Sequence, residues 1–194
     1  MKSKLHVLLV FFIAISFSVS AIQKKNDTGK RGKKNGSMKL NPDAPEETAM
    51  LGQLAGTWNA EATVRNRDGS WSEKKVKAIW DWYYILDGHG VQDDWFTIDA
   101  AGKRHHYGTN IRIYNSDDKL WHMAWIDIHD RKLAIFTAVN ENGSVIMTGI
   151  SSSGRKVRNT FHDITHDSFD WYKEWTNDDG KTWFGVSRIH CTRM

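Results

Sequence analysis

Five turn dipeptides divide most of the chain into short apolar and aromatic segments: Asp68-Gly69, Ala101-Gly102, Asn142-Gly143, Ser153-Gly154 and Asp179-Gly180. Glycine, with asparagine or aspartate before it, adopts the positive φ angles that tight hairpins need. Turns spaced in this way, with no long helical pattern between them, are typical of an antiparallel sandwich or barrel. We therefore expect an all-β chain whose sheet closes into a barrel, a fold that offers a cavity.

The first 21 residues have the pattern of an export signal. Lys2 and Lys4 precede an apolar run over residues 7–17, and small residues at 19–21 offer a site for signal peptidase. The run is shorter than the roughly 20 apolar residues that span hydrocarbon. We therefore prefer a cleaved signal peptide at residues 1–21 to a membrane anchor, and expect a secreted or periplasmic protein.

Residues 22–40 are basic and contain almost nothing to bury. Seven basic side chains and one acidic side chain give this segment a net charge of +6, whereas residues 41–194 carry about −4. The composition predicts a disordered linker, because such a segment cannot offset its ordering entropy. A nucleic-acid partner is not expected, since its basic footprint should lie on the folded domain. The tail could make weak contact with an anionic surface, although a solvated spacer is the simpler interpretation.

Residues 41–194 form one predicted domain. Apolar spacing over residues 44–54, after Asn41-Pro42-Asp43 and before Gly56, predicts a short N-terminal helix. Strands are expected near residues 58–65, 72–82, 90–97, 107–114, 120–127, 133–139, 145–150, 156–163, 168–175 and 182–192. Cys191 is the only cysteine, so no intramolecular disulfide can form. We expect it to be packed, although pairing between chains is an alternative.

Alternation along the strands predicts which side chains face inward. The first two strands each have one apolar face, formed by Trp58, Ala60, Ala62 and Val64 and by Val76, Ala78, Trp80 and Trp82. Both faces are apolar in the strand near residues 120–127, where Trp121, Met123 and Trp125 compete with Leu120, Ala124 and Ile126. We therefore expect the helix or a partner to cover part of the outside of the sheet.

The segment Leu54-Ala55-Gly56-Thr57-Trp58 resembles the G-x-W start of lipocalins and related calycin barrels. In such barrels an arginine of the last strand often packs across that tryptophan, a place that either Arg188 or Arg193 could take. Residues 50–193 also resemble an uncharacterised bacterial family of lipocalin-like domains, through segments 108–114, 161–165, 168–171 and 178–183 and through Trp121 with Trp125. The resemblance implies a calycin barrel of about 8–10 strands with a cavity, and no established reaction.

Ten tryptophans are the strongest compositional indication of function. Large flat apolar rings that carry an N–H group suit the binding of ring-shaped or lipid-like ligands. Our candidates for the walls of a ligand site are Trp80, Trp82, Trp121, Trp125, Trp171 and Trp175. The alternative is that these rings simply fill the barrel or shield its outer face.

Arg112 and Asp93 are the charged candidates for the same site. If Ile111 and Ile113 face outward, the guanidinium of Arg112 points into the barrel, where it could hold a carboxylate or phosphate in a bidentate pair. Alternation equally allows an exposed arginine. Asp93 and Asp94 are adjacent, so a strand sends one of them to each face, and one could be the internal partner of Arg112.

No motif of known catalytic or metal chemistry accompanies these residues. There is no H-E-x-x-H or G-x-S-x-G pattern, and a strand would point His105 and His106 apart. We therefore predict no catalytic residue, no metal and no cofactor. Haem held by a single histidine, His122 or His190, is a minor alternative.

Together these features predict an exported, lipocalin-like barrel that binds a small hydrophobic or amphipathic ligand without turnover. Two alternatives stay open. One is an enzyme that uses the same cavity, with Arg112 and an interior aspartate or histidine acting on the substrate. The other is an envelope-associated interaction protein whose basic tail docks on a polyanionic surface.

Overall fold

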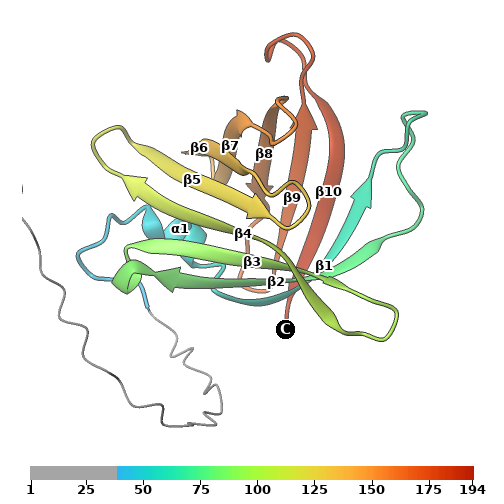
Figure 1. Cartoon of the computed structure of the whole chain (residues 1–194). Coiled ribbons are helices and arrows are strands. Elements are labelled where there is room, and N and C mark those ends of the chain that lie inside the picture. The colour runs from blue at the N-terminus through green and yellow to red at the C-terminus, as the bar shows by residue number, and fades with distance from the viewer. Residues whose placement is uncertain (1–38) are drawn as a thin grey trace, which may run out of the picture. The chain divides into compact units, whose positions relative to one another are not determined.

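Ten antiparallel strands form a closed barrel, as the computed structural model of residues 39–194 shows (Figure 1). Each strand pairs with its neighbours in sequence, and β1 closes the ring against β10. The strands are β1 Gly56–Val64, β2 Val76–Ile85, β3 Gly90–Ile98, β4 Arg104–Asn115, β5 Leu120–Asp127, β6 Leu133–Glu141, β7 Ser144–Ile150, β8 Lys156–His162, β9 Ser168–Trp175 and β10 Phe184–Arg193. The helix α1 spans Thr48–Gly52, and a single turn of 3-10 helix, η1, spans Leu86–Gly88.

The predicted all-β barrel and the approximate positions of its ten strands are confirmed, with two local differences. The helix is shorter than the predicted residues 44–54, because Pro45 and Glu46 accept tight i to i+3 backbone hydrogen bonds before its first turn. The second strand begins at Val76 instead of residue 72, after a loop. The predicted signal peptide and nearly all of the predicted linker lie outside the described residues. Within residues 39–194, no helix has both the length and the apolar character needed to span a membrane.

The end of the barrel where β1 begins is closed by α1 and by aromatic packing. Leu51 and Leu54 are fully buried, and the indole N–H of Trp58 donates to the Leu54 carbonyl at 2.7 Å. Arg193 lies 4.0 Å above the Trp58 ring and donates to the Ala55 carbonyl at 2.9 Å. Arg193 is therefore the arginine that packs across the G-x-W tryptophan, whereas Arg188 packs on Trp71 at 4.6 Å.

The predicted inward faces hold except at the opposite end of the barrel. Trp58, Ala60 and Ala62 are buried, as are the alternate residues Ala78, Trp80 and Trp82 of β2. Val64 and Val76 were wrongly predicted to be buried, since they are 44% and 47% exposed. Both lie where β1 ends and β2 begins, at the end of the barrel that α1 does not close.

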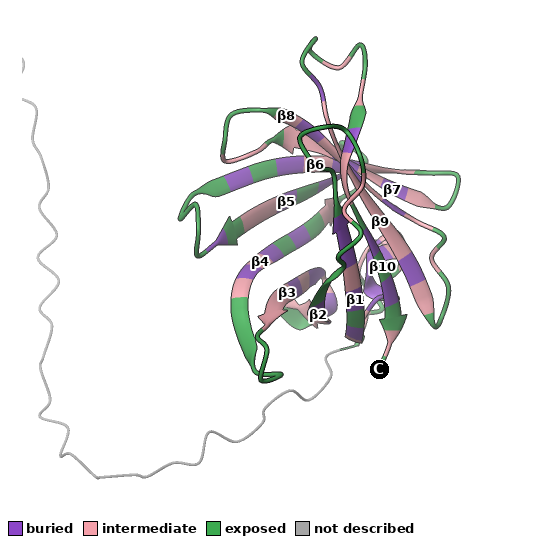
Figure 2. Ribbon diagram, turned by 90° about the vertical axis from the view of Figure 1, so that its right-hand side faces the viewer, coloured by how far each residue is buried: buried purple, intermediate pink, exposed green. Residues whose placement is uncertain are grey.

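Trp121 and Met123 of β5 face the interior, while the alternate residues face outward. Ile126 is exposed, as are Ile111 on β4 and Ile135 on β6, and Figure 2 shows the alternation of buried and exposed residues along β4. The prediction that the helix covers this outer face was wrong, because α1 packs against β2 and β3. Coverage by a partner stays a prediction.

Candidate ligand-binding cavity

A cavity of about 370 Å³ lies inside the barrel toward the end opposite α1. Its walls come from inward-facing residues of nearly every strand, and its rim from the connections β5–β6 and β7–β8. Aromatic rings are prominent in the wall, and polar groups lie both deep in the cavity and at its mouth. The lining includes Trp80, Trp95, Tyr107, Trp125, Phe136, Phe161 and Trp171 and the polar residues Asp93, Asn110, Arg112, Asp127, Asp130, Asn159, Lys173 and Ser187.

A buried ion pair forms the deep end of the cavity. Arg112 is 1% exposed and Asp93 is 0% exposed, and their side chains are in direct contact. Trp80 donates its indole N–H to Asp93 at 2.7 Å, and the Arg112 guanidinium stacks on Trp82 at 4.4 Å. Burial raises the pKa of Asp93, opposed by the charge of Arg112, and burial lowers the pKa of Arg112, opposed by Asp93. Asp93 is thus the aspartate of the adjacent pair that meets Arg112.

Several polar atoms of the lining have no hydrogen-bond partner among residues 39–194. They are the Nε of Arg112 and the amide oxygens of Asn110 and Asn159. A buried polar group without a partner costs about 1–3 kcal/mol. A ligand that brings an acceptor to Arg112 and donors to the two amides would remove that cost, so these atoms mark the polar contacts of a bound molecule.

Lys173 lies at the mouth, on β9, and its pKa is lowered by burial, opposed by Asp130 and Asp127. In the sheet it is level with Asn159 on β8 and Ser187 on β10, and all three residues line the cavity. Asp127 is held in place by the indole N–H of Trp125 at 2.8 Å and by the backbone N–H of Asp130 at 2.7 Å. Burial raises the pKa of Asp127, but these hydrogen bonds hold it below its ordinary value.

The predicted tryptophans separate into two groups. Trp80, Trp125 and Trp171 line the cavity, as do Asp93 and Arg112. Trp82, Trp121 and Trp175 are not part of the lining, which corrects their predicted place. Trp82 lies beneath Arg112, Trp121 packs against Tyr114 nearer the closed end, and Trp175 is held between Phe184 and Arg155 at the rim.

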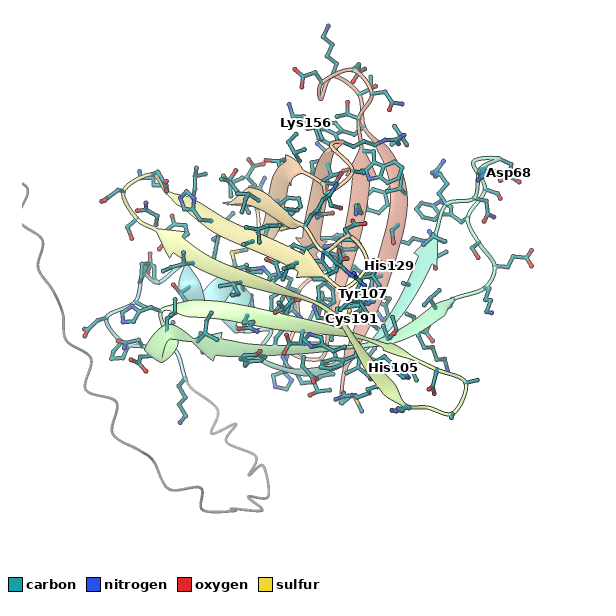
Figure 3. The ribbon with its side chains drawn as sticks, in the orientation of Figure 1. Asp68, His105, Tyr107, His129, Lys156 and Cys191 are labelled. Atoms are coloured by element: carbon teal, nitrogen blue, oxygen red, sulfur yellow. The ribbon has the colours of Figure 1, made fainter. Side chains whose placement is uncertain are left out.

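Sequence reasoning missed several residues of the lining, some of which the alternation could have found. Lys173 is two residues from Trp171, and Asn110 is two residues from Arg112, so each shares a face with a predicted site residue. Tyr107 could not have been found in this way, because β4 has a bulge between His106 and Gly108. Tyr107 lies beside His129, with ring centroids 5.7 Å apart (Figure 3).

The histidines proposed for haem do not line this cavity. His122 is exposed and paired with Asp118 at 2.7 Å, and His190 is exposed and paired with Asp170 at 2.9 Å, so both face away from the cavity. His105 and His106 likewise bind separate carboxylates, those of Asp99 and Asp94. Within residues 39–194, no three metal-ligating side chains come together.

The single cysteine is packed in the core. Cys191 is fully buried as a free thiol on β10, and burial raises its pKa. Because the nucleophilic form of cysteine is the thiolate, this environment makes the residue inert. The structure therefore assigns Cys191 a packing role.

Comparison with known proteins identifies the fold class. No protein-family model matches the chain, and no curated protein matches it. The S-type phycobiliprotein lyase CPES from Guillardia theta is similar in structure, at 11% identity and a TM-score of 0.53, covering 75% of this chain and 91% of that one. Rv2717c from M. tuberculosis is similar at 10% identity and a TM-score of 0.54, covering 78% of this chain and 99% of that one. Identities this low show the fold alone, which is a calycin-like barrel.

Proposed function

We propose that this protein binds a small amphipathic molecule inside its barrel, without turnover. The observation that carries the proposal is the cavity of about 370 Å³, which combines aromatic walls with buried polar groups that lack partners. Small-molecule sites are typically concave, largely apolar and about 300–1,000 Å³ in volume, with a few convergent polar groups. The cavity has each of these properties.

The arrangement of charge also limits what the deep end of the ligand can be. The sequence indicates that Arg112 could hold a ligand carboxylate or phosphate in a bidentate pair. In the structure, however, Asp93 already neutralises that guanidinium. The Nε of Arg112 has no partner among residues 39–194 and can donate one hydrogen bond. The ligand is therefore expected to present a neutral acceptor, such as a carbonyl or ether oxygen, at its deep end, and a flat apolar body against Trp80, Trp125 and Trp171.

Two further proposals rest on the sequence alone. We propose that the protein acts outside the cytoplasm, because residues 1–21 have the pattern of an export signal. We also propose that this chain is related to the uncharacterised bacterial family of lipocalin-like domains, because of the sequence segments quoted above. The basic tail is then a spacer with at most weak attraction to anionic surfaces.

Native mass spectrometry of the full chain, purified from an exporting host, tests the proposed binding. A stoichiometric small molecule that is released on unfolding would support it and identify the ligand class. Trp171→Ala should reduce the bound fraction, whereas Trp183→Ala, at a ring that packs under Arg158 and is not part of the lining, should not. A protein that is purified without a bound molecule, and whose tryptophan fluorescence does not change when lipids, haem or aromatic acids are added, would count against a ligand cavity.

A further inference from the structure

Lys173 is unusual among the lysines of residues 39–194, because it alone lines the cavity. Its backbone is part of β9, so the side chain is positioned by the sheet and not by a loop. Asn159 and Ser187 lie directly beside it on the two neighbouring strands. The sheet therefore holds the amine of Lys173 at the cavity, near the aromatic residues of the lining.

The surroundings of Lys173 shift its amine toward the neutral, nucleophilic form. No carboxylate of residues 39–194 lies within ion-pair distance of it, although Asp127 and Asp130 are near enough to oppose the effect of burial. A lysine that is taken out of water in an apolar pocket loses its proton more easily. Desolvation of this kind is one way in which proteins activate lysine as a nucleophile toward carbonyl compounds.

We infer that Lys173 captures an aldehyde or ketone by forming an imine inside the barrel. This inference rests on the proposed function, since it names the chemical class of the ligand for the same cavity. The carbonyl carbon would lie at the mouth beside Lys173, and the apolar body would extend between Trp80, Trp125 and Trp171. The deep end would then meet the free Nε of Arg112.

The reaction balances without any further reagent. The lone pair of the Lys173 amine attacks the carbonyl carbon, and the π electrons of the C=O bond move to oxygen. The oxygen takes up a proton and the nitrogen loses one, which gives a neutral carbinolamine. The nitrogen lone pair then forms the C=N bond as the hydroxyl group leaves with a proton as water. One water is released for each ligand, nothing is oxidised or reduced, and protons exchange with solvent at the mouth. Asp127 and Asp130 would stabilise the positive charge of the protonated imine.

Reductive trapping on the full chain tests the inference. The protein is incubated with 4-(dimethylamino)cinnamaldehyde and cyanoborohydride, and the modified peptides are mapped by mass spectrometry. We expect the adduct on Lys173, together with a red-shifted visible band of the protonated imine before reduction. At neutral pH the rate of labelling at Lys173 should exceed that of Nα-acetyl-lysine, because a lowered pKa leaves more of the amine in its neutral form.

Two substitutions separate Lys173 from ordinary surface lysines. Lys173→Met should abolish the specific adduct, while Lys156→Met should leave it unchanged. Lys156 is exposed, pairs with Asp179 at 3.2 Å and lies away from Tyr107 and His129 at the mouth (Figure 3). If Lys173→Met does not fold, Lys173→Arg decides, because arginine keeps the charge but forms no imine with the probe under these conditions.

The alcohol of the same probe distinguishes failure of the inference from failure of the proposed function. If the alcohol quenches tryptophan fluorescence saturably but the aldehyde labels lysines only according to their exposure, the imine is overturned and the binding cavity stands. If neither compound binds and Lys173 is not labelled, both are overturned. Labelling of Lys173→Met to the same extent as the natural chain would also overturn the inference.

Discussion

The two ends of this barrel use similar residues for opposite purposes. At the closed end, Arg193 lies over Trp58 and donates to the backbone carbonyls of Gln53, Ala55 and His166. At the open end, the side chain of Lys173 makes no hydrogen bond or ion pair with any residue in the described part of the chain. The partly buried cation at the closed end bonds to the fold, whereas the partly buried cation at the open end has no bonding partner among the described residues. Because buried polar groups are normally hydrogen-bonded, this difference supports the proposal that the ligand site lies at the open end.

The comparison also explains why the aromatic residues differ in role. Near α1, Trp58 meets Phe169 edge to face at 4.8 Å and both are fully buried. Trp171, on the same strand as Phe169 but two residues nearer the mouth, is only partly buried and lines the cavity. The position of a ring along the barrel axis, and not its residue type, decides whether it supports the fold or contacts a ligand.

The largest effect is expected from Trp58→Ala. Truncating a fully buried aromatic residue typically lowers the free energy of unfolding by about 3–5 kcal/mol, and Trp58 also donates a buried hydrogen bond. Trp171→Ala should lower it by clearly less, because its ring already borders a cavity. Urea unfolding of both variants measures the difference. Equal losses would contradict the division into a structural end and a binding end.

The next largest effect concerns the ion pair at the deep end. Arg112→Met leaves Asp93 buried without a neutralising cation, and breaking such a pair typically costs about 3–5 kcal/mol. Replacing both residues, with Arg112→Met and Asp93→Leu together, should recover most of the loss, since no buried charge is left. A double variant as unstable as the single one would show that the pair stabilises the barrel beyond neutralising itself.

The same single variant should depend on pH in a defined direction. Burial already raises the pKa of Asp93, and without Arg112 only the hydrogen bond from Trp80 opposes this effect. The folded state then holds a proton that the unfolded chain releases above its ordinary pKa of 3.8. The stability of Arg112→Met should therefore fall as pH rises above about 4, until Asp93 ionises in the folded protein. Urea unfolding between pH 4 and neutral measures the slope, and a flat profile would contradict it.

Much of the fold could be predicted from the sequence, because local rules decide it. Turn dipeptides located the hairpins, and alternation located the inward faces of β1 and β2. Alternation also left open whether Arg112 points inward. The structure settles this, because Ile111 and Ile113 are exposed on the outer face and Arg112 meets Asp93 inside.

The depth of each residue in the barrel could not be predicted. Trp80 and Trp82 share a face, yet Trp80 lines the cavity and Trp82 lies beneath Arg112. Which end is closed depends on where α1 packs, and this is a long-range contact with β2 and β3 that no local pattern encodes. The lining at the mouth also depends on a bulge in β4, which moves Tyr107 out of simple alternation.

A smaller effect should follow from removing the cation at the mouth. Burial lowers the pKa of Lys173 below 10.5, so keeping this lysine charged costs free energy in the folded chain but not in the unfolded chain. Lys173→Met should therefore be more stable than the natural chain near neutral pH. The difference in unfolding free energy between Lys173→Met and the natural chain should disappear as pH rises from the folded pKa of Lys173 toward 10.5. In this range the natural chain binds fewer protons when folded than when unfolded, so its stability rises with pH. Urea unfolding between pH 7 and 10 checks this, with Lys156→Met as the control. A constant gap would mean that Lys173 is not desolvated.

The smallest effect is expected in the β9–β10 loop that follows the mouth. Asp178 accepts hydrogen bonds from the Thr182 hydroxyl at 2.6 Å and its backbone N–H at 2.8 Å, and these bonds lower its pKa to about 2. Their contribution is present above the ordinary pKa of 3.8 and is lost as pH falls toward 2. Asp178→Ala should open this loop at neutral pH and speed tryptic cleavage after Lys181, while cleavage after Lys103 in the β3–β4 turn stays constant. Because Asp178 is exposed, urea unfolding should barely change. Unchanged cleavage at Lys181 would show that the loop is held by other contacts, and a large loss of global stability would extend the structural part of the barrel to its open end.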